Sequence, residues 1–369
     1  MASPPPPPPP LPAELVEEVL LRCPPDDPAR LFCAALVCKP WCRLVSAPPF
    51  HRRYREFHRR GAPMLGFIIN LQESNSEFTV SRFVSRSSFR PLRTDWRGLR
   101  TLDARHGRVL LTNTPWGPRP EDNVLVVWNP ITGERLELPK LPLRPDPYQC
   151  PWMATVLCAA GDGCDHLDCH RGPFQVVFVI SSPVEMFSRV YSSEKGKWLR
   201  PIHGQRTHYD KLKLAPGLLV GGALYFMFHW SPKILKYDVT TREMNLNGGL
   251  GVTAVDDTII KQWSRGGPDE DNGWTQSKVV DLKRLLPADA SDFVDVVGSA
   301  EGTGVLFMRT PSGLFSVDPK SGRAMKVDLE GEPSFFNIIP YMSYNMPGIT
   351  LLTLRFSVIF QLIRNCEFV

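Results

Sequence analysis

The chain has 369 residues, of which 43% are hydrophobic and 22% charged, so it is long enough for two globular domains. The formal net charge of +5 is too small an excess to indicate nucleic-acid binding by itself. The longest apolar stretch, Ile349–Ile363, is interrupted by Arg355 and Gln361 and is shorter than the roughly 20 residues of a spanning helix. With nine cysteines and no secretory signal pattern at its start, we expect reduced thiols, no membrane span, and a place in the nucleus and/or cytoplasm.

The first ten residues, Met1–Pro10, are almost pure proline. Such a run lacks backbone donors and favours an extended, solvated polyproline conformation. A ligand for a proline-recognising domain is one interpretation. We expect the commoner one, a disordered leader.

Between residues 11 and 60 the apolar residues recur at helical spacing. The first helix is predicted from a face at i, i+1, i+4, i+5 and i+8, made by Leu15, Val16, Val19, Leu20 and Cys23. Three further helices are each restarted by proline, at Asp27-Pro28, Lys39-Pro40 and Pro48-Pro49, with Asp27 offering a side-chain N-cap. Helices this short do not persist alone, so we expect a small all-α domain.

The pattern of this segment resembles an F-box. The matching residues are Leu11-Pro12, Leu15, Glu18-Val19-Leu20, Pro24, Leu31, Val37-Cys38-Lys39, Trp41, Leu44-Val45 and Phe50. The resemblance implies binding to the Skp-type adaptor of a cullin–RING ubiquitin ligase. It assigns the adaptor surface or its support to Leu11, Pro12, Leu15, Val19, Leu20, Leu31, Val37, Cys38 and Trp41. The alternative, which can hold at the same time, is that these are core residues of a helical subdomain.

His51–Arg60 (HRRYREFHRR) carries five arginines with Tyr54 and Phe57 between them. Basic residues interleaved with aromatics are typical of nucleic-acid contacts. Because the aromatics keep helical spacing from Phe50, we expect them to be core and the arginines to form a solvated face. Gly61 then marks the end of the domain.

After Gly61 the hydrophobic period changes to two. Three segments repeat one layout of glycine turn, strand, loop, strand, tight turn and strand: His106–Pro139, Gly221–Leu246 and Gly302–Val327. Phe174–Pro201 and Val252–Leu282 are weaker copies. We therefore predict an α+β multidomain chain, an all-α domain at 11–60 followed by an all-β propeller of about six blades at 61–345, closed by a strand at Met64–Leu71. A pair of β-sandwiches is the alternative architecture.

This second region resembles the F-box-associated propeller of a large plant, grass-type F-box family. The resemblance rests on Pro63–Phe67, Trp128–Gly133, Gly163–His170 and Ile339–Ser343. Residues 346–369 depart from the family pattern, so we expect an atypical tail, disordered or prone to aggregation where exposed.

One loop concentrates metal-ligating residues: Cys158, Cys164, His166, Cys169 and His170, with Cys150 nearby. These are ligand types that zinc prefers, and Cys164/Cys169 or His166/His170 have plausible spacing. Because the sequence contains no C-x2-C pair and all lie near one glycine-rich loop, we expect unmetallated thiols, with no metal and no cofactor.

No hydrolase, phosphate-loop, dinucleotide or zinc-protease motif occurs in the sequence. We therefore expect a non-catalytic substrate-recognition subunit of a Skp-adaptor–cullin–F-box (SCF) ubiquitin ligase, with the propeller binding an unidentified protein substrate. The alternative is a ligand- or nucleic-acid-binding propeller with a purely structural helical front end. A propeller glycosidase is a third hypothesis, which the absence of motifs disfavours.

Overall fold

The computed structural model describes most of the chain from residue 11 to residue 347. The described ranges are 11–58, 61–72, 79–113, 124–141, 152–161, 163–181, 186–204, 211–229, 233–248, 251–256, 259–265, 274–281, 285–286, 294–300, 303–319, 321–329 and 335–347. The proline-rich leader, the tail from residue 348, Cys150 and residues 114–123 lie outside them. Among the described residues, no helix is both long and apolar enough to cross a membrane.

The chain divides into two compact units. One contains Met1–Leu65, Ser85–Arg90 and Ser343–Val369, and the other contains Gly66–Val84 and Pro91–Met342. We call them the helical unit and the propeller unit.

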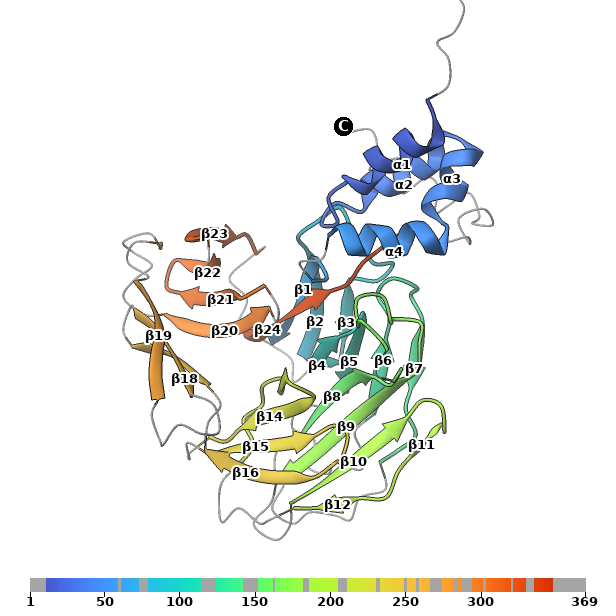
Figure 1. Cartoon of the computed structure of the whole chain (residues 1–369). Coiled ribbons are helices and arrows are strands. Elements are labelled where there is room, and N and C mark those ends of the chain that lie inside the picture. Colours follow the sequence, from blue (N-terminus) through green and yellow to red (C-terminus); the bar gives the residue numbers. More distant parts are fainter. Residues whose placement is uncertain are drawn as a thin grey trace, which may run out of the picture. The chain divides into compact units, whose positions relative to one another are not determined.

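The helical unit holds α1 (Ala13–Leu21), α2 (Ala29–Val37), α3 (Lys39–Val45) and α4 (Pro48–Phe57), coloured blue in Figure 1. The predicted proline restarts are confirmed at α3 and α4, which have Pro at N1 or N2. The predicted Asp27 cap is wrong. The N-cap of α2 is Pro28, without a side-chain cap bond, and Asp27 Oδ2 instead accepts a hydrogen bond from Arg30 Nε at 3.0 Å.

The centre of the helical unit is built around the aromatic residues of α4. Phe50 and Tyr54 are each 1% exposed, and the Tyr54 hydroxyl donates to Cys23 O at 2.7 Å. Tyr344, from the far end of the chain, packs edge-on against Tyr54 and donates its hydroxyl to His58 O at 3.2 Å. Phe57, expected in the core, is exposed. Residues far apart in sequence therefore share one small core.

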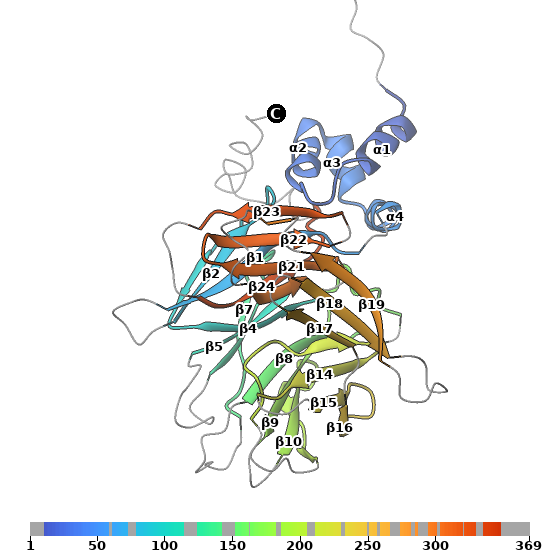
Figure 2. The same ribbon diagram turned by 90° about the vertical axis from the view of Figure 1, so that its left-hand side faces the viewer.

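The propeller unit consists of antiparallel sheets that follow one another in chain order (Figures 1 and 2). The sheet that contains both ends of the region has the order β24-β1-β2-β3. Its strands are β1 (Met64–Gln72), β2 (Thr79–Ser85), β3 (Asp95–Arg97) and β24 (Phe335–Met342). The predicted pairing of the strand at Met64–Leu71 with the C-terminal end is confirmed, and it closes the ring.

The next three sheets each match a predicted repeat. The second contains β4 (Arg100–Arg105), β5 (Arg108–Thr112), β6 (Leu125–Trp128) and β7 (Arg135–Glu137). The third contains β8 (Trp152–Cys158), β9 (Phe174–Ser181), β10 (Met186–Ser192), β11 (Lys197–Trp198) and β12 (Ile202–His203). The fourth contains β13 (Leu218–Val220), β14 (Ala223–Met227), β15 (Lys233–Asp238) and β16 (Met244–Gly248).

The last two sheets differ in size. One contains β17 (Gly251–Asp256), β18 (Ile259–Arg265) and β19 (Trp274–Asp281), and the other β20 (Asp295–Ala300), β21 (Val305–Thr310), β22 (Gly313–Asp318) and β23 (Arg323–Val327). The described strands thus make five blades of four or more strands, and a sheet of only three strands at β17–β19. The prediction of about six blades is therefore wrong by one, because the weak copy at Val252–Leu282 supplies no fourth strand in the described part of the chain.

The tight turns that marked the repeats share one geometry. The backbone N–H of Gly133 bonds to Asn129 O at 2.8 Å, and that of Gly322 bonds to Asp318 O at 2.9 Å, both glycines having positive φ. In the copy that begins at Asp238, Arg242 takes the glycine position with φ 64° and donates to Asp238 O at 2.8 Å. A side chain there is unfavourable, so the neighbouring sheet pairing must outweigh that cost.

Candidate functional site

The helical unit exposes apolar side chains that its own core does not use. On α1, Val16, Leu20 and Leu21 are buried, whereas Leu15 and Val19 are 55% and 63% exposed. Leu15 and Val19 are four residues apart, which places them along one stripe of α1, and the exposed Leu11 lies just before the helix. Exposed apolar residues of this size, gathered on one element, are typical of an interaction surface.

Further exposed side chains lie where α2 ends and α3 begins. We call the whole exposed set the outer face and define it as Leu11, Pro12, Leu15, Val19, Leu36, Val37 and Cys38, all of which are exposed. Val37 is the last residue of α2. No further turn of that helix follows it, because Cys38 is extended, with φ −160° and ψ 161°.

The nine residues that the F-box resemblance singled out take two positions in the structure. Six belong to the outer face: Leu11, Pro12, Leu15, Val19, Val37 and Cys38. Leu20 and Leu31 are buried, at 4% and 1% exposure, and Trp41 is half-buried, so these three are not exposed parts of that face. Leu36, also part of the outer face, is not among the nine, because apolar spacing alone does not distinguish the exposed side of α2 from its buried side.

Charged residues flank α1 on its other sides. Glu17 Oε1 lies 2.6 Å from Arg53 Nη1 on α4, and Glu18 Oε1 lies 2.9 Å from Arg22 Nη2. Arg52 and Arg53 are exposed, as expected for a solvated face of the basic run. Because the ion pairs of Glu17 and Glu18 lie on other sides of α1, the apolar stripe is the uncharged side of this helix.

The cysteine-rich loop of the propeller unit also forms a cluster. Cys158, Cys164, His166 and Cys169 come together, with all their ligand atoms within 4.8 Å of one another. His170 does not join them: its Nδ1 lies 3.0 Å from Asp168 Oδ1. Burial raises the pKa of the Cys158 thiol, and burial together with the neighbouring thiols raises that of Cys169 far above its usual range.

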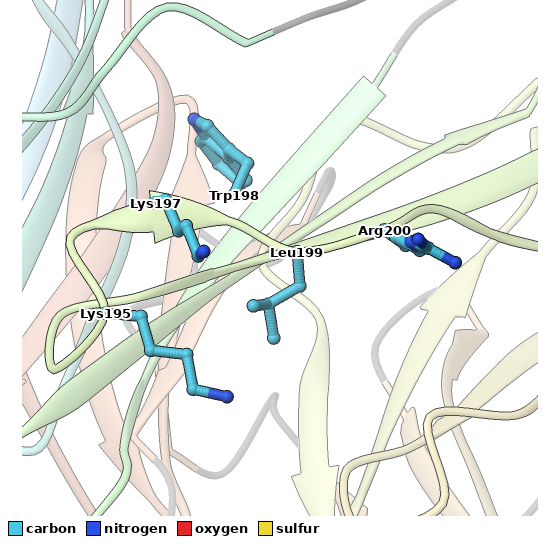
Figure 3. Close-up of a pocket in the computed structure, with 5 residues that line it drawn as sticks. All are labelled: Lys195, Lys197, Trp198, Leu199 and Arg200. Atoms are coloured by element: carbon cyan, nitrogen blue, oxygen red, sulfur yellow. The ribbon is translucent and has the colours of Figure 1, made fainter.

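A pocket of about 600 Å³ lies along the β10–β11 hairpin, lined by Lys195, Lys197, Trp198, Leu199 and Arg200. Figure 3 shows these side chains spread along the hairpin rather than converging on one point. The Trp198 Nε1–H is already taken by Pro139 O at 2.8 Å. A small-molecule site needs polar groups that converge on the ligand, so this pocket does not indicate a ligand-binding site.

Comparison with known proteins supports the helical unit as a defined domain. Residues 10–53 match the F-box domain family model. An F-box protein of Arabidopsis thaliana is 22% identical over 290 residues, which covers 69% of this chain and 72% of that protein.

Solved structures resemble the chain only distantly. A prolyl endopeptidase structure has 13% identity and a TM-score of 0.37, covering 70% of this chain, which spans 38% of that protein's length. A nidogen/laminin complex has 11% identity and a TM-score of 0.40, covering 75% of this chain and 98% of that one. Similarity at this level carries no argument, and the architecture rests on the sheet topology described above.

Together these observations define the class of protein: a helical F-box domain followed by a β-propeller. Within that class, the chain is a distant homologue of a plant F-box protein.

Proposed function

We propose that this protein is the substrate-recognition subunit of an SCF ubiquitin ligase. Its outer face docks a Skp-type adaptor, and its propeller binds the protein to be ubiquitinated. The observation that carries the proposal is the coincidence of the F-box match at 10–53 with the exposed apolar stripe on α1.

The exposure of the outer face supports a docking role over a purely structural one. Leu15 and Val19 contribute little hydrophobic stabilisation to the folded chain, because more than half of each side chain is exposed. Burying such side chains in a partner contributes roughly 1.5–3 kcal/mol each, and a few central apolar residues commonly dominate an interface. Leu20 and Leu31, buried beneath, hold the helices that present them.

The second half of the proposal concerns the reaction. The ligase holds a substrate close to a ubiquitin-carrying subunit, and this proximity accelerates transfer without a catalytic group on the receptor. The roles expected of this chain are therefore two binding surfaces, one per unit.

The docking half is tested by a pull-down with a purified Skp-type adaptor. We expect Leu15→Asp and Val19→Asp each to abolish capture, because a carboxylate would be buried in an apolar interface. Val220→Asp is the matched control, since Val220 is also an exposed valine, at 45%, but belongs to the propeller unit. Full capture of both helical variants would overturn the docking role and leave the ligand- or nucleic-acid-binding propeller.

The recognition half is tested by proximity labelling in cells with and without proteasome inhibition. A substrate is a labelled protein whose level rises when the proteasome is inhibited. In cells that carry only the Val19→Asp variant, proteasome inhibition should no longer raise the level of that protein. If no labelled protein depends on the adaptor-binding residue in this way, the substrate-receptor role is wrong.

A further inference from the structure

The cysteine cluster, to which the proposed function gives no role, lies in the propeller unit where β8 and β9 are joined (Figure 1). Cys158 is the last residue of β8 and pairs with Phe174, the first residue of β9. Cys164, His166 and Cys169 lie in the connection between these two strands. The strand ladder therefore holds one thiol in place, and the loop brings three further ligand groups to it.

The separation of the sulfur atoms fits a tetrahedral metal site. Cys158 Sγ lies 3.8 Å from Cys164 Sγ. With zinc–sulfur bonds of about 2.3 Å, two thiolates at the corners of a tetrahedron lie about 3.8 Å apart. A disulfide needs about 2.05 Å, so the observed pair is not bonded. All four ligand atoms lie within 4.8 Å of one another, so a small contraction of the cluster would place them around one ion.

Neighbouring groups orient the ligands in the way that supporting residues do in metal sites. The Ala160 backbone N–H donates to Cys158 Sγ at 3.4 Å. His106, from the turn between β4 and β5, stacks on the His166 ring with centroids 4.6 Å apart and accepts a hydrogen bond from Cys158 N at 2.9 Å. His166 itself has φ 57°, a conformation that non-glycine residues seldom adopt without a compensating interaction.

The charge around the cluster also suits an anionic metal complex. Three thiolates, one neutral imidazole and a divalent ion carry a net charge of −1. Arg108, 4% exposed, donates from Nη1 to Cys169 O at 3.0 Å and from Nη2 to Gly172 O. Its guanidinium therefore lies against the loop that would bear this charge, where an opposite charge lowers the cost of burial.

We propose that Cys158, Cys164, His166 and Cys169 bind one Zn²⁺ ion in a structural Cys₃His site. Thiolate and imidazole ligands in a tetrahedral set select zinc among the common divalent ions. Because the protein supplies all four ligands, the site has no open position for catalysis, and its role is to pin the β8–β9 connection. The proposed zinc site differs from the expectation of unmetallated thiols. That expectation placed all the ligands in one loop, whereas Cys158 is the last residue of β8 and is held by the sheet.

The proposal is independent of adaptor docking and is tested on the full chain, purified under reducing conditions without added chelator. We expect one zinc per chain by elemental analysis. X-ray absorption should show three sulfur ligands at about 2.3 Å and one nitrogen at about 2.0–2.1 Å. Replacement by Co²⁺ should give the sulfur-to-cobalt charge-transfer bands and strong d–d bands of a tetrahedral thiolate site.

Variants then assign the ligands. We expect Cys164→Ser, Cys169→Ser and His166→Ala to purify with little or no zinc, whereas His166→Cys keeps it by supplying a fourth thiolate. Cys23→Ser is the matched control, since Cys23 is a free thiol of the helical unit, and His170→Ala should also keep its zinc. The wild-type absorption spectrum decides the matter if the ligand variants do not fold.

Three results would overturn the proposal. The first is wild-type protein that neither contains zinc nor binds Co²⁺ after reduction. The second is a disulfide between Cys158 and either loop cysteine in protein isolated from its host under thiol-trapping conditions. The third is a metal shell with fewer than three sulfurs.

Discussion

Asn70, on β1, makes the hydrogen bonds that hold the ring closure together. It is fully buried, and its Nδ2 donates to Thr101 O and to Asn337 Oδ1, both at 2.8 Å. Its Oδ1 accepts from Ser81 Oγ at 2.7 Å and from Thr101 N at 2.8 Å. One side chain thus connects β1, the first strand of the propeller, to β2, to β4 and to the last strand, β24.

We expect Asn70→Leu to destabilise the propeller unit by about 2–6 kcal/mol. The leucine has a similar volume, so the cost comes from the partners rather than from a cavity. Asn337 Oδ1 and the Thr101 carbonyl both lose a donor in a buried site, and each such loss costs roughly 1–3 kcal/mol. The Thr101 backbone N–H keeps its hydrogen bond to Ser81 Oγ at 2.8 Å, so the loss of Asn70 Oδ1 leaves this donor satisfied and adds no further cost.

Urea unfolding followed by tryptophan fluorescence measures the effect, with Asn245→Leu as the matched control, an exposed asparagine on β16. The midpoint of Asn70→Leu should fall by about 1–3 M at a slope of about 2 kcal/mol/M, while the control midpoint stays within error. Equal midpoints for the two variants would refute the role of the network. Because the chain has two compact units, the fluorescence of Trp41 in the helical unit should be removed by Trp41→Phe in all samples.

Two further predictions concern single positions in the propeller unit. A Cβ at Gly298 would lie 2.4 Å from Ile338 O, so we expect Gly298→Ala to shift β20 against β24 and to lower the unfolding free energy by about 1–3 kcal/mol; an unchanged urea midpoint would contradict this. Burial raises the pKa of Tyr237 to about 12, so the folded state favours the protonated phenol. The stability from this group is complete below pH of about 10 and is lost as the pH rises through about 12, by up to about 3 kcal/mol. Tyr237→Phe should remove that alkaline loss in unfolding experiments and cost nothing at neutral pH, because the described residues offer its hydroxyl no hydrogen-bond partner.

Much of the fold follows from local chemistry and was predictable. Proline restarts set the starts of α3 and α4, and the tight turns of two repeats form where Asn or Asp is followed four residues later by glycine. The ring closure followed because a single apolar strand before the first repeat needed a partner. What could not be predicted depends on contacts distant in sequence. Tyr344 packs on Tyr54, and Arg242 occupies a glycine position, and nothing near either residue indicates this.

The docking surface was predictable in composition but not in orientation. Leu15, Val16, Val19 and Leu20 occupy both sides of α1, so periodicity marks the helix as apolar without saying which half faces inward. That choice is made by α4, whose Phe50 and Tyr54 form the core. The same limit applies to α2, where Leu36 is 40% exposed although Leu31 and Ala35 are buried.

The two proposed sites use different chemistry in different units, and this makes each a control for the other. The outer face depends on exposed apolar side chains of α1 and α2, which contain no ligand of the cysteine cluster. The cluster depends on thiolates in the propeller unit, so chelation should leave adaptor capture intact while loosening the β8–β9 connection. If Val19→Asp also lost zinc, the variant would be acting through misfolding rather than through docking. If Cys164→Ser kept adaptor capture but lost substrate labelling, the pinned connection would be part of the surface by which the propeller selects its substrate.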